Sequence, residues 1–440
     1  MTGNRHSLRI AAAMAVTATI AACSGTGKLP PSQSAAGLAA SPGAAATPAP
    51  VHDALLVVAR PDQADLDVIL ASTGQHVMTL PSAIPDQRWG HLVTATPAGS
   101  GTRVQQVDLT SGLDAPDIVF AGHWRLPTIG SDPLPAGRSA DGSTLALVEE
   151  GAAAALTTSR FAVVDLSRAR LPHVIELNGS FEFDAISPDG ATLYVVEHLD
   201  PGPGGHYQVR AVDAKTGRLA EGTIVDKANP GESMAGYPIE QQRMAQGIVL
   251  TLYRGVEHPF VHALDTLHGG AVCLDLPPTR HDDAQAAADW GLARSPDGRT
   301  VYAVNATIGS AVEIDPQALS IRRSANIGPA SAAITLAKFG HQDVGVTGRR
   351  VLVSPDGSRV FAASATGIVE LATRDLSVTR RLLAGTRVDA LGLTPDGTAL
   401  FVLRHADGGI DQVDVATGAV VAHVRGTGFD RLLAVVPLDG

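Results

Sequence analysis

The sequence reads Ser295-Pro296-Asp297-Gly298-Arg299-Thr300-Val301-Tyr302-Ala303-Val304, a turn signal followed by an apolar run. Proline presets φ at the first turn position, aspartate accepts hydrogen bonds from the backbone ahead, and glycine adopts the positive φ that closes a hairpin. The run after the turn is rich in β-branched and aromatic residues, which are typical of a buried strand. The stretch therefore predicts a tight turn that leads into a β-strand.

The same turn and strand recur along the chain. Strong copies begin at Ser187, Ser354 and Thr394, and a weaker copy begins at Ser139. A second element follows each time: an apolar run that ends in aspartate, a turn that closes near glycine, and a short strand. Its clearest copies run from Val107 to Gly112, Val212 to Gly217, Leu264 to Gly269 and Val413 to Gly418, with divergent copies at Val164-Asp165 and Ile314-Asp315. Two hairpins in each unit predict a four-stranded sheet.

The spacing of these units predicts the fold. They recur every roughly 38 to 57 residues, which is the scale of a β-propeller blade. We count about eight units, with seven the alternative if the irregular first two merge. The last apolar stretch, Leu432–Val436, has no unit after it. We therefore expect it to pair with the first blade, which starts near Leu55, and to close the ring. The sequence thus predicts an all-β protein, with a single propeller over residues 53–440.

The run from Ser295 to Asn305 resembles the repeat of YVTN-type β-propellers, a group that includes lactonase-like propellers and cytochrome-d1-like domains. The resemblance covers most of the chain after residue 55. It implies the fold more than the function, because these propellers include enzymes, binding proteins and bacterial lipoproteins without an assigned role. The Gly-x-x-Pro ending of the family repeat is hardly visible here, and no Trp-Asp dipeptide of WD40 type occurs.

The N-terminal segment has the parts of an export signal. Arg5 and Arg9 precede an apolar stretch, Ile10–Ala22, which is too short to span a bilayer. Its end, Ile20-Ala21-Ala22-Cys23, resembles the lipobox of bacterial lipoproteins, which implies that Cys23 is diacylated and becomes the mature N-terminus. The alternative is an ordinary signal peptide that is cleaved nearby. We expect residues 1–22 to be a lipoprotein signal peptide and the protein to be extracytoplasmic and anchored to the cell membrane.

Residues 23–52 read as a tether. The segment consists mainly of Ala, Pro, Ser, Gly and Thr. Such a composition cannot bury enough apolar surface to offset the entropy of ordering. We expect a disordered spacer between the anchor and the propeller.

Charge and cysteine content exclude two classes. The 440-residue chain carries 44 acidic and 33 basic side chains and a net charge of −11, without the Lys and Arg clusters that nucleic-acid binding needs. Its two cysteines, Cys23 and Cys273, exclude a disulfide framework if the first is acylated. Cys273 lies in an apolar run and reads as a small buried hydrophobe. We expect a monomer that does not bind nucleic acid.

The candidate site lies on one face of the predicted propeller. Strands alternate in direction, so the Pro-Asp-Gly turns share one face, and the longest connections, 227–236, 277–289 and 327–348, open on the other, where binding is expected. Alignment of the repeats places a mixed set of side chains just past the second strand of each unit: Glu149, Glu197, Tyr253, Asn305, Ser364 and Arg404, with His405 among their neighbours. We predict that they form a binding rim. The alternative is that strand ends are polar because they meet water.

No metal or cofactor site is predicted. His258 and His262 have a helical spacing but flank the start of a strand, where about 13 Å would separate them, too far to share one ion. His281-Asp282-Asp283 reads as a solvated loop. Nucleophile-elbow, P-loop and Rossmann motifs are absent from the sequence.

The leading hypothesis for function is therefore a ligand- or protein-binding scaffold module, whose partner is an envelope protein or a small ligand. The alternative is a lactonase-like or other hydrolase that uses rim carboxylates such as Glu149 and Glu197, with or without a metal. A redox accessory role ranks last, because the chain lacks a haem-attachment Cys-x-x-Cys-His motif.

Overall fold

The computed structural model describes residues 52–438, except 62–64, 87–88, 109–116, 131, 133, 152–156, 201–204, 225–233, 256–257, 278–288 and 329–347. These described residues belong to one compact unit, Pro50–Gly440. Cys23, most of the predicted tether and the loop with His281, Asp282 and Asp283 lie outside the described residues. So do most residues of the three long connections.

All named elements of the described part are β-strands, and none of its residues forms a helix long and apolar enough to cross a membrane. Six sheets have four strands and one has seven, so the predicted all-β class is confirmed. The first three sheets contain β31 (Arg431–Pro437), β1 (Ala54–Ala59), β2 (Leu66–Leu70) and β3 (His76–Leu80); β4 (Ala83–Pro85), β5 (His91–Ala98), β6 (Gly101–Asp108) and β7 (Ile118–Ala121); and β8 (Trp124–Arg125), β9 (Thr144–Glu149), β10 (Thr158–Asp165) and β11 (His173–Asn178).

The remaining sheets continue in chain order. The seven-stranded sheet contains β12 (Phe181–Ile186), β13 (Thr192–His198), β14 (His206–Asp213), β15 (Met234–Arg243), β16 (Ile248–Gly255), β17 (Phe260–Asp265) and β18 (Gly270–Asp275). The last three contain β19 (Gly291–Arg294), β20 (Val301–Asn305), β21 (Ser310–Asp315) and β22 (Ser320–Asn326); β23 (Val351–Val353), β24 (Arg359–Ser364), β25 (Gly367–Ala372) and β26 (Val378–Leu382); and β27 (Val388–Leu393), β28 (Ala399–Arg404), β29 (Ile410–Asp414) and β30 (Val420–His423).

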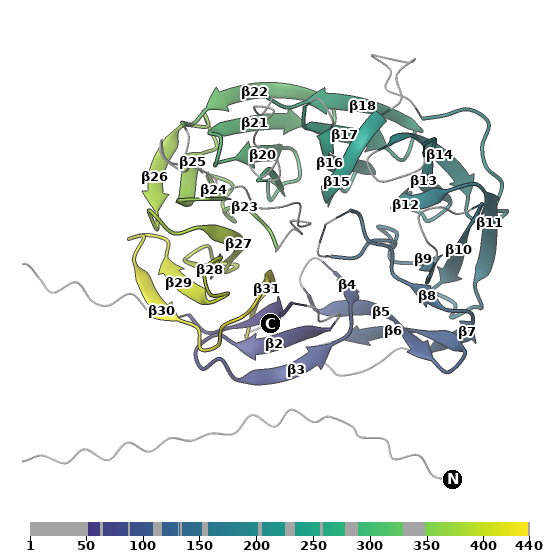
Figure 1. Ribbon diagram of the computed structural model, residues 1–440, viewed down its shortest axis with the longest axis horizontal. Coiled ribbons are helices and arrows are strands. Elements are labelled where there is room, and N and C mark those ends of the chain that lie inside the picture. The colour runs from purple at the N-terminus through teal and green to yellow at the C-terminus, as the bar shows by residue number, and fades with distance from the viewer. Residues whose placement is uncertain are drawn as a thin grey trace, which may run out of the picture. The chain divides into compact units, whose positions relative to one another are not determined.

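The sheets are arranged around a common centre as the blades of a propeller. Figure 1 shows β3, β11, β22 and β26 at the periphery and β4, β23 and β31 toward the centre. Within each sheet, consecutive strands pair antiparallel, as the two predicted hairpins require.

The seven-stranded sheet joins two of the predicted units. Only two pairs of residues connect β14 to β15, His206 with Ala235 and Tyr207 with Met234. Leu219 and Ile224 also bridge to β14, where a fourth strand of that unit would lie. Division at the β14–β15 junction gives eight groups of strands, whereas the undivided sheet gives seven.

The C-terminal strand lies against the first one. β31 pairs antiparallel with β1, and Leu55 faces Val436 while Leu56 faces Val435. In Figure 1 the yellow β31 lies beside the purple N-terminal strands. β31 therefore supplies the innermost strand that the first unit lacks.

The Pro-Asp-Gly turns are held by a repeated set of hydrogen bonds. The Gly190 N–H donates to the Ser187 carbonyl (2.9 Å), and the Ser187 hydroxyl donates to Asp189 Oδ1 (2.6 Å). The Ser187 hydroxyl oxygen in turn accepts from the Thr192 N–H at 2.9 Å. Gly190 adopts a φ of 72°, which suits glycine. The same hydroxyl–aspartate bond occurs in the other four copies: Ser139–Asp141, Ser295–Asp297, Ser354–Asp356 and Thr394–Asp396.

The core lies between neighbouring sheets. One buried cluster joins Leu250 and Val261 of the seven-stranded sheet to Val301 and Val312 of the next, with the fully buried Trp290 between them. A second cluster joins the sheet of β10 to that of β12 in the same way. Packing of sheet against sheet leaves the innermost strands to line the centre.

Candidate functional site: an axial cavity

A cavity of about 460 Å³ lies among the innermost strands. Its volume falls within the range of small-molecule sites. Five sheets contribute strands to it, namely those of β4, β15, β19, β23 and β31, and the segment between β8 and β9 also lines it. The lining includes Ile84, Trp89, Ile129, Asp132, Leu134, Gln241, Gln242, Arg243, Leu292, Arg294, Arg349, Val351 and Leu433.

The cavity lies toward the face that carries the Pro-Asp-Gly turns. Arg243 is the last residue of β15, and Arg294 is the last residue of β19, directly before the turn at Ser295. Val353 likewise ends β23, directly before the turn at Ser354. All three line the cavity. This is the face opposite the one on which the loop lengths predict binding.

Among the described residues of the cavity lining, Arg349 forms an ion pair with a buried carboxylate. It donates to Glu240, whose side chain is only 3% exposed. Glu240 also accepts from the Leu292 N–H (2.9 Å) and from Gln242 Nε2 (3.0 Å). Burial raises the pKa of Glu240, and Arg349 opposes that rise. The charge of Arg349 is thus compensated within the protein.

Arg243 and Arg294 bond to backbone carbonyls instead. Arg294 Nη1 donates to the carbonyl of Arg243 (3.2 Å), and Arg243 Nη1 donates to that of Arg138 (3.1 Å). Within the described residues, neither Arg243 nor Arg294 has a carboxylate within 4.0 Å. Buried Arg243 Nη2 also has no hydrogen-bond partner there. Arg243 and Arg294 are therefore held in the lining by backbone carbonyls rather than by a direct ion pair.

The electrostatic surroundings of Arg243 and Arg294 differ. Burial lowers the pKa of Arg243, while Asp132 and Asp184 oppose this effect. Burial also lowers the pKa of Arg294, and the neighbouring Arg349 guanidinium lowers it further. Burial raises the pKa of Asp184 to about 7, although Arg243 acts against this. Arg294 is therefore the guanidinium of the lining that an added negative charge would stabilise most.

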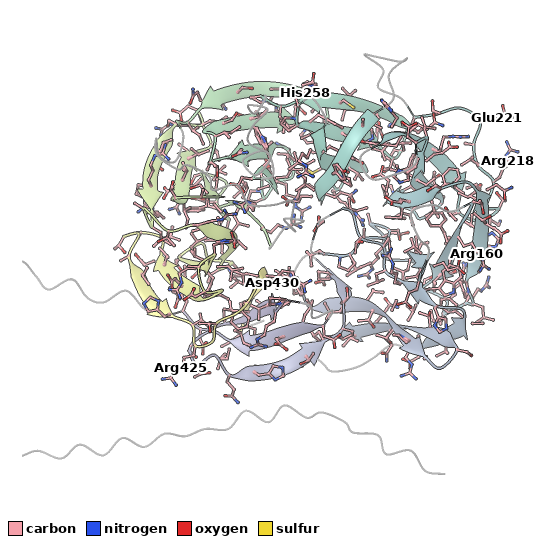
Figure 2. The ribbon with its side chains drawn as sticks, in the orientation of Figure 1. Arg160, Arg218, Glu221, His258, Arg425 and Asp430 are labelled. Atoms are coloured by element: carbon pink, nitrogen blue, oxygen red, sulfur yellow. The ribbon has the colours of Figure 1, made fainter. Side chains whose placement is uncertain are left out.

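The predicted rim residues lie at equivalent strand ends, but their charged members are paired within their own sheets. Glu149 pairs with Arg160 at 2.6 Å and Glu197 with Arg210 at 2.7 Å. Figure 2 shows Arg160 at the periphery, away from the centre. Arg404 forms ion pairs with Asp407 and Asp411. His405 Nδ1 lies 2.7 Å from an Asp389 carboxylate oxygen.

Tyr253, Asn305 and Ser364 are buried. Tyr253 is 2% exposed and stacks between Tyr207 and Phe260, at centroid distances of 5.5 and 5.0 Å. Asn305 is fully buried, and its Oδ1 accepts backbone N–H bonds from the turn that follows β20. These three side chains therefore support the fold locally, whereas Glu149 lines a second cavity, of about 280 Å³.

The histidines do not gather into a metal centre. Within the part of the chain that the structure describes, no three His, Cys, Asp or Glu side chains form a group that could hold an ion. His258, labelled in Figure 2, pairs with Asp275 at 2.9 Å, whereas His262 is buried. Cys273 is half-buried rather than fully buried as predicted, because β18 is the outermost strand of its sheet; its Sγ lies 3.6 Å from the Met234 sulfur.

A signal for the cavity was present in the repeats. In three turns the first residue, whose carbonyl accepts the closing hydrogen bond, directly follows an arginine. These pairs are Arg138-Ser139, Arg243-Met244 and Arg294-Ser295. Alignment on the residue before the turn, rather than on the end of the second strand, places three arginines at one position. The sequence interpretation missed it because Met244 interrupts the Ser-Pro-Asp-Gly pattern.

No protein-family model matches the sequence, and no curated protein matches it. Among solved structures, apo AztD from Citrobacter koseri is 12% identical, with a TM-score of 0.50 over 88% of this chain and 98% of the other. The dihydro-heme d1 dehydrogenase NirN in complex with DHE is 14% identical, with a TM-score of 0.50 over 87% and 75%. The β-propeller domain of Cps50 (Swd1) from Myceliophteria thermophila is 12% identical, with a TM-score of 0.37 over 68% and 88%. At such identities the likenesses to AztD and NirN concern the fold alone.

Proposed function

We propose that this chain is a ligand-binding β-propeller that acts outside the cytoplasm and is anchored to the cell membrane through acylated Cys23. The axial cavity carries the proposal. It combines an apolar wall with guanidinium groups and has the volume of a small-molecule site. Its walls come from the innermost strands of several sheets, so the scaffold holds the site rigidly. These features support a small ligand over an envelope protein.

The pairing of the rim carboxylates favours binding over hydrolysis. A general base must be able to take a proton from water or substrate. Glu149 forms an ion pair with Arg160 at 2.6 Å, and Glu197 forms one with Arg210 at 2.7 Å, so both carboxylates already bind a side chain of the protein. In the lactonase-like alternative, either carboxylate would have to leave its ion pair before it could act as a base.

The anchor rests on the sequence. The apolar stretch Ile10–Ala22 ends at Cys23, and a two-chain lipid anchor holds a protein stably on a membrane. In cells fed an alkynyl palmitate, the wild type is expected in the membrane fraction with the label. Cys23→Ala is expected unlabelled and released from the membrane. Label on the Ala variant would contradict the anchor.

The binding role is tested with the full chain purified from its native host. Denaturation should release one small molecule in stoichiometric amount, detected by mass spectrometry. Leu134 lines the cavity and is half-buried, so Leu134→Trp should fill the cavity and abolish the yield. Val119→Trp is the matched control, because Val119 is 50% exposed on the outer strand β7. Equal yields from all three proteins would place the ligand elsewhere or refute the proposal.

A further inference from the structure

We infer that the axial cavity binds a monocarboxylate with an apolar body, and that Arg294 pairs with its carboxylate group. The inference rests on the proposed binding function and names the ligand class. Three observations carry it: Arg294 lacks a counter-charge, its guanidinium makes a single hydrogen bond within the described residues, and apolar side chains line the same cavity.

Arg294 is an arginine of the cavity lining that has no carboxylate within 4.0 Å among the described residues. Glu240 compensates Arg349, with which it forms a direct ion pair. Arg243 lies near Asp132 and Asp184, both of which favour its charged form. The charged neighbour of Arg294 is Arg349, which disfavours its charge. A carboxylate on the ligand would therefore supply the counter-charge that Arg294 lacks, whereas the lining aspartates Asp86 and Asp132 would disfavour a second negative charge.

The hydrogen bonds of Arg294 orient its guanidinium group. Nη1 donates to the carbonyl of Arg243 at 3.2 Å, its only hydrogen bond within the described residues. The other N–H donors of the guanidinium have no protein acceptor among the described residues, and Arg294 lines the cavity. A guanidinium fork matches the two oxygens of a carboxylate, and such charge-assisted bonds are about twice as strong as neutral ones.

The rest of the lining suits an apolar body. Trp89, Ile84, Ile129, Val351 and Leu433 line the same cavity as Arg294. Burial of apolar ligand surface against such side chains contributes about 25 cal/mol per Å². Charged and polar groups that fix orientation beside apolar side chains are found in many small-molecule sites, and this cavity offers both kinds of surface.

The test titrates the full chain, stripped of any copurified molecule, with three probes that share one ring system: 2-naphthoate, 2-naphthamide and 2-naphthyl phosphate. Isothermal titration calorimetry measures each dissociation constant. We expect naphthoate to bind more tightly than the amide and the phosphate. Arg294→Gln should weaken naphthoate binding by about tenfold to hundredfold and leave amide binding unchanged. Arg294→Lys should fall between, because it keeps the charge and loses the fork.

Arg299→Gln is the matched control. Arg299 lies in the same sheet's turn but is exposed, so its loss should not change naphthoate binding. Thermal unfolding of each variant establishes that it folds. If naphthoate and naphthamide bind equally and Arg294→Gln changes neither, the inference is overturned while the binding function stands. Preference for the phosphate overturns the monocarboxylate class. Absence of binding by all three probes overturns the inference, whereas the native-host extraction decides the proposed function separately.

Discussion

Two sets of charged side chains occupy repeated positions in this propeller, and the protein treats them in opposite ways. At the ends of the second strands, Glu149, Glu197 and Arg404 each find a partner of opposite charge within their own sheet. At the ends of the innermost strands, Arg243 and Arg294 find backbone carbonyls instead. Repetition places a side chain at a strand end, but the absence of a counter-charge near Arg294 is what points to a ligand.

The reason for the difference lies in the distance between neighbouring strands. Second and third strands pair directly, so a charge on one reaches a charge on the other across the ladder, as Glu197 reaches Arg210. An innermost strand has a partner on one side only. Its side chains reach across the axis to other sheets, as Arg349 reaches Glu240.

The largest effect is expected for the arginine that already has a counter-charge. Arg349→Met leaves buried Glu240 without its partner and should lower the free energy of unfolding by about 3 kcal/mol. Arg294→Met, the matched variant, removes no ion pair and should change it by less than about 1 kcal/mol. Urea unfolding measures both. Equal losses would show that the two arginines are not compensated differently.

The next largest effect is expected for an aspartate of the Pro-Asp-Gly turns, whose substitution should change stability but not ligand binding. The hydroxyls of Ser354 and Ser358 lower the pKa of Asp356 from 3.8 to about 2. Because the folded pKa is depressed, the stabilisation is present above the unfolded value and is lost as pH falls from about 4 to 2. Asp356 is exposed, so Asp356→Asn should cost only about 1 kcal/mol at pH 7.

That cost should vanish as the pH approaches 2, where the wild type has lost the same stabilisation. Denaturant melts at several pH values measure it. Ligand yield should stay at the wild-type level, because Asp356 does not line the cavity. A loss that is independent of pH would assign the effect to the turn geometry rather than to the charge.

The smallest effect is expected at the paired strand ends. Glu197→Gln keeps a hydrogen-bond acceptor for Arg210, and partly exposed pairs contribute less than about 1 kcal/mol. We expect a loss of about 0.5 kcal/mol in urea unfolding and no change in the copurified ligand. If Glu197→Gln lost the ligand but kept its stability, the ligand would bind at the rim rather than in the axial cavity.

The sequence predicted the parts of the fold that depend on local chemistry. Ser187, Asp189 and Gly190 bond to one another within one turn, so their pattern alone indicates the hairpin. The pairing of Leu432–Val436 with β1 was also predictable, because an apolar stretch without a following unit needs a partner.

The site was not predictable in the same way. Tyr253 and Asn305 stand at the same repeat position as Glu197, yet Tyr253 stacks on Phe260 and Asn305 caps a turn. Neither outcome can be read from a position in a repeat, because it depends on neighbours from other strands. The cavity depends further on which innermost strands lie side by side, as those of Arg243 and Arg294 do.

The pairing of β31 with β1 has a consequence for the order of folding. The first sheet receives its innermost strand from the segment that is synthesised after all the other sheets. Until that segment arrives, β1 presents an open edge and the ring cannot close. Completion of the first sheet therefore waits until β31 has been synthesised, after the strands of the six other sheets.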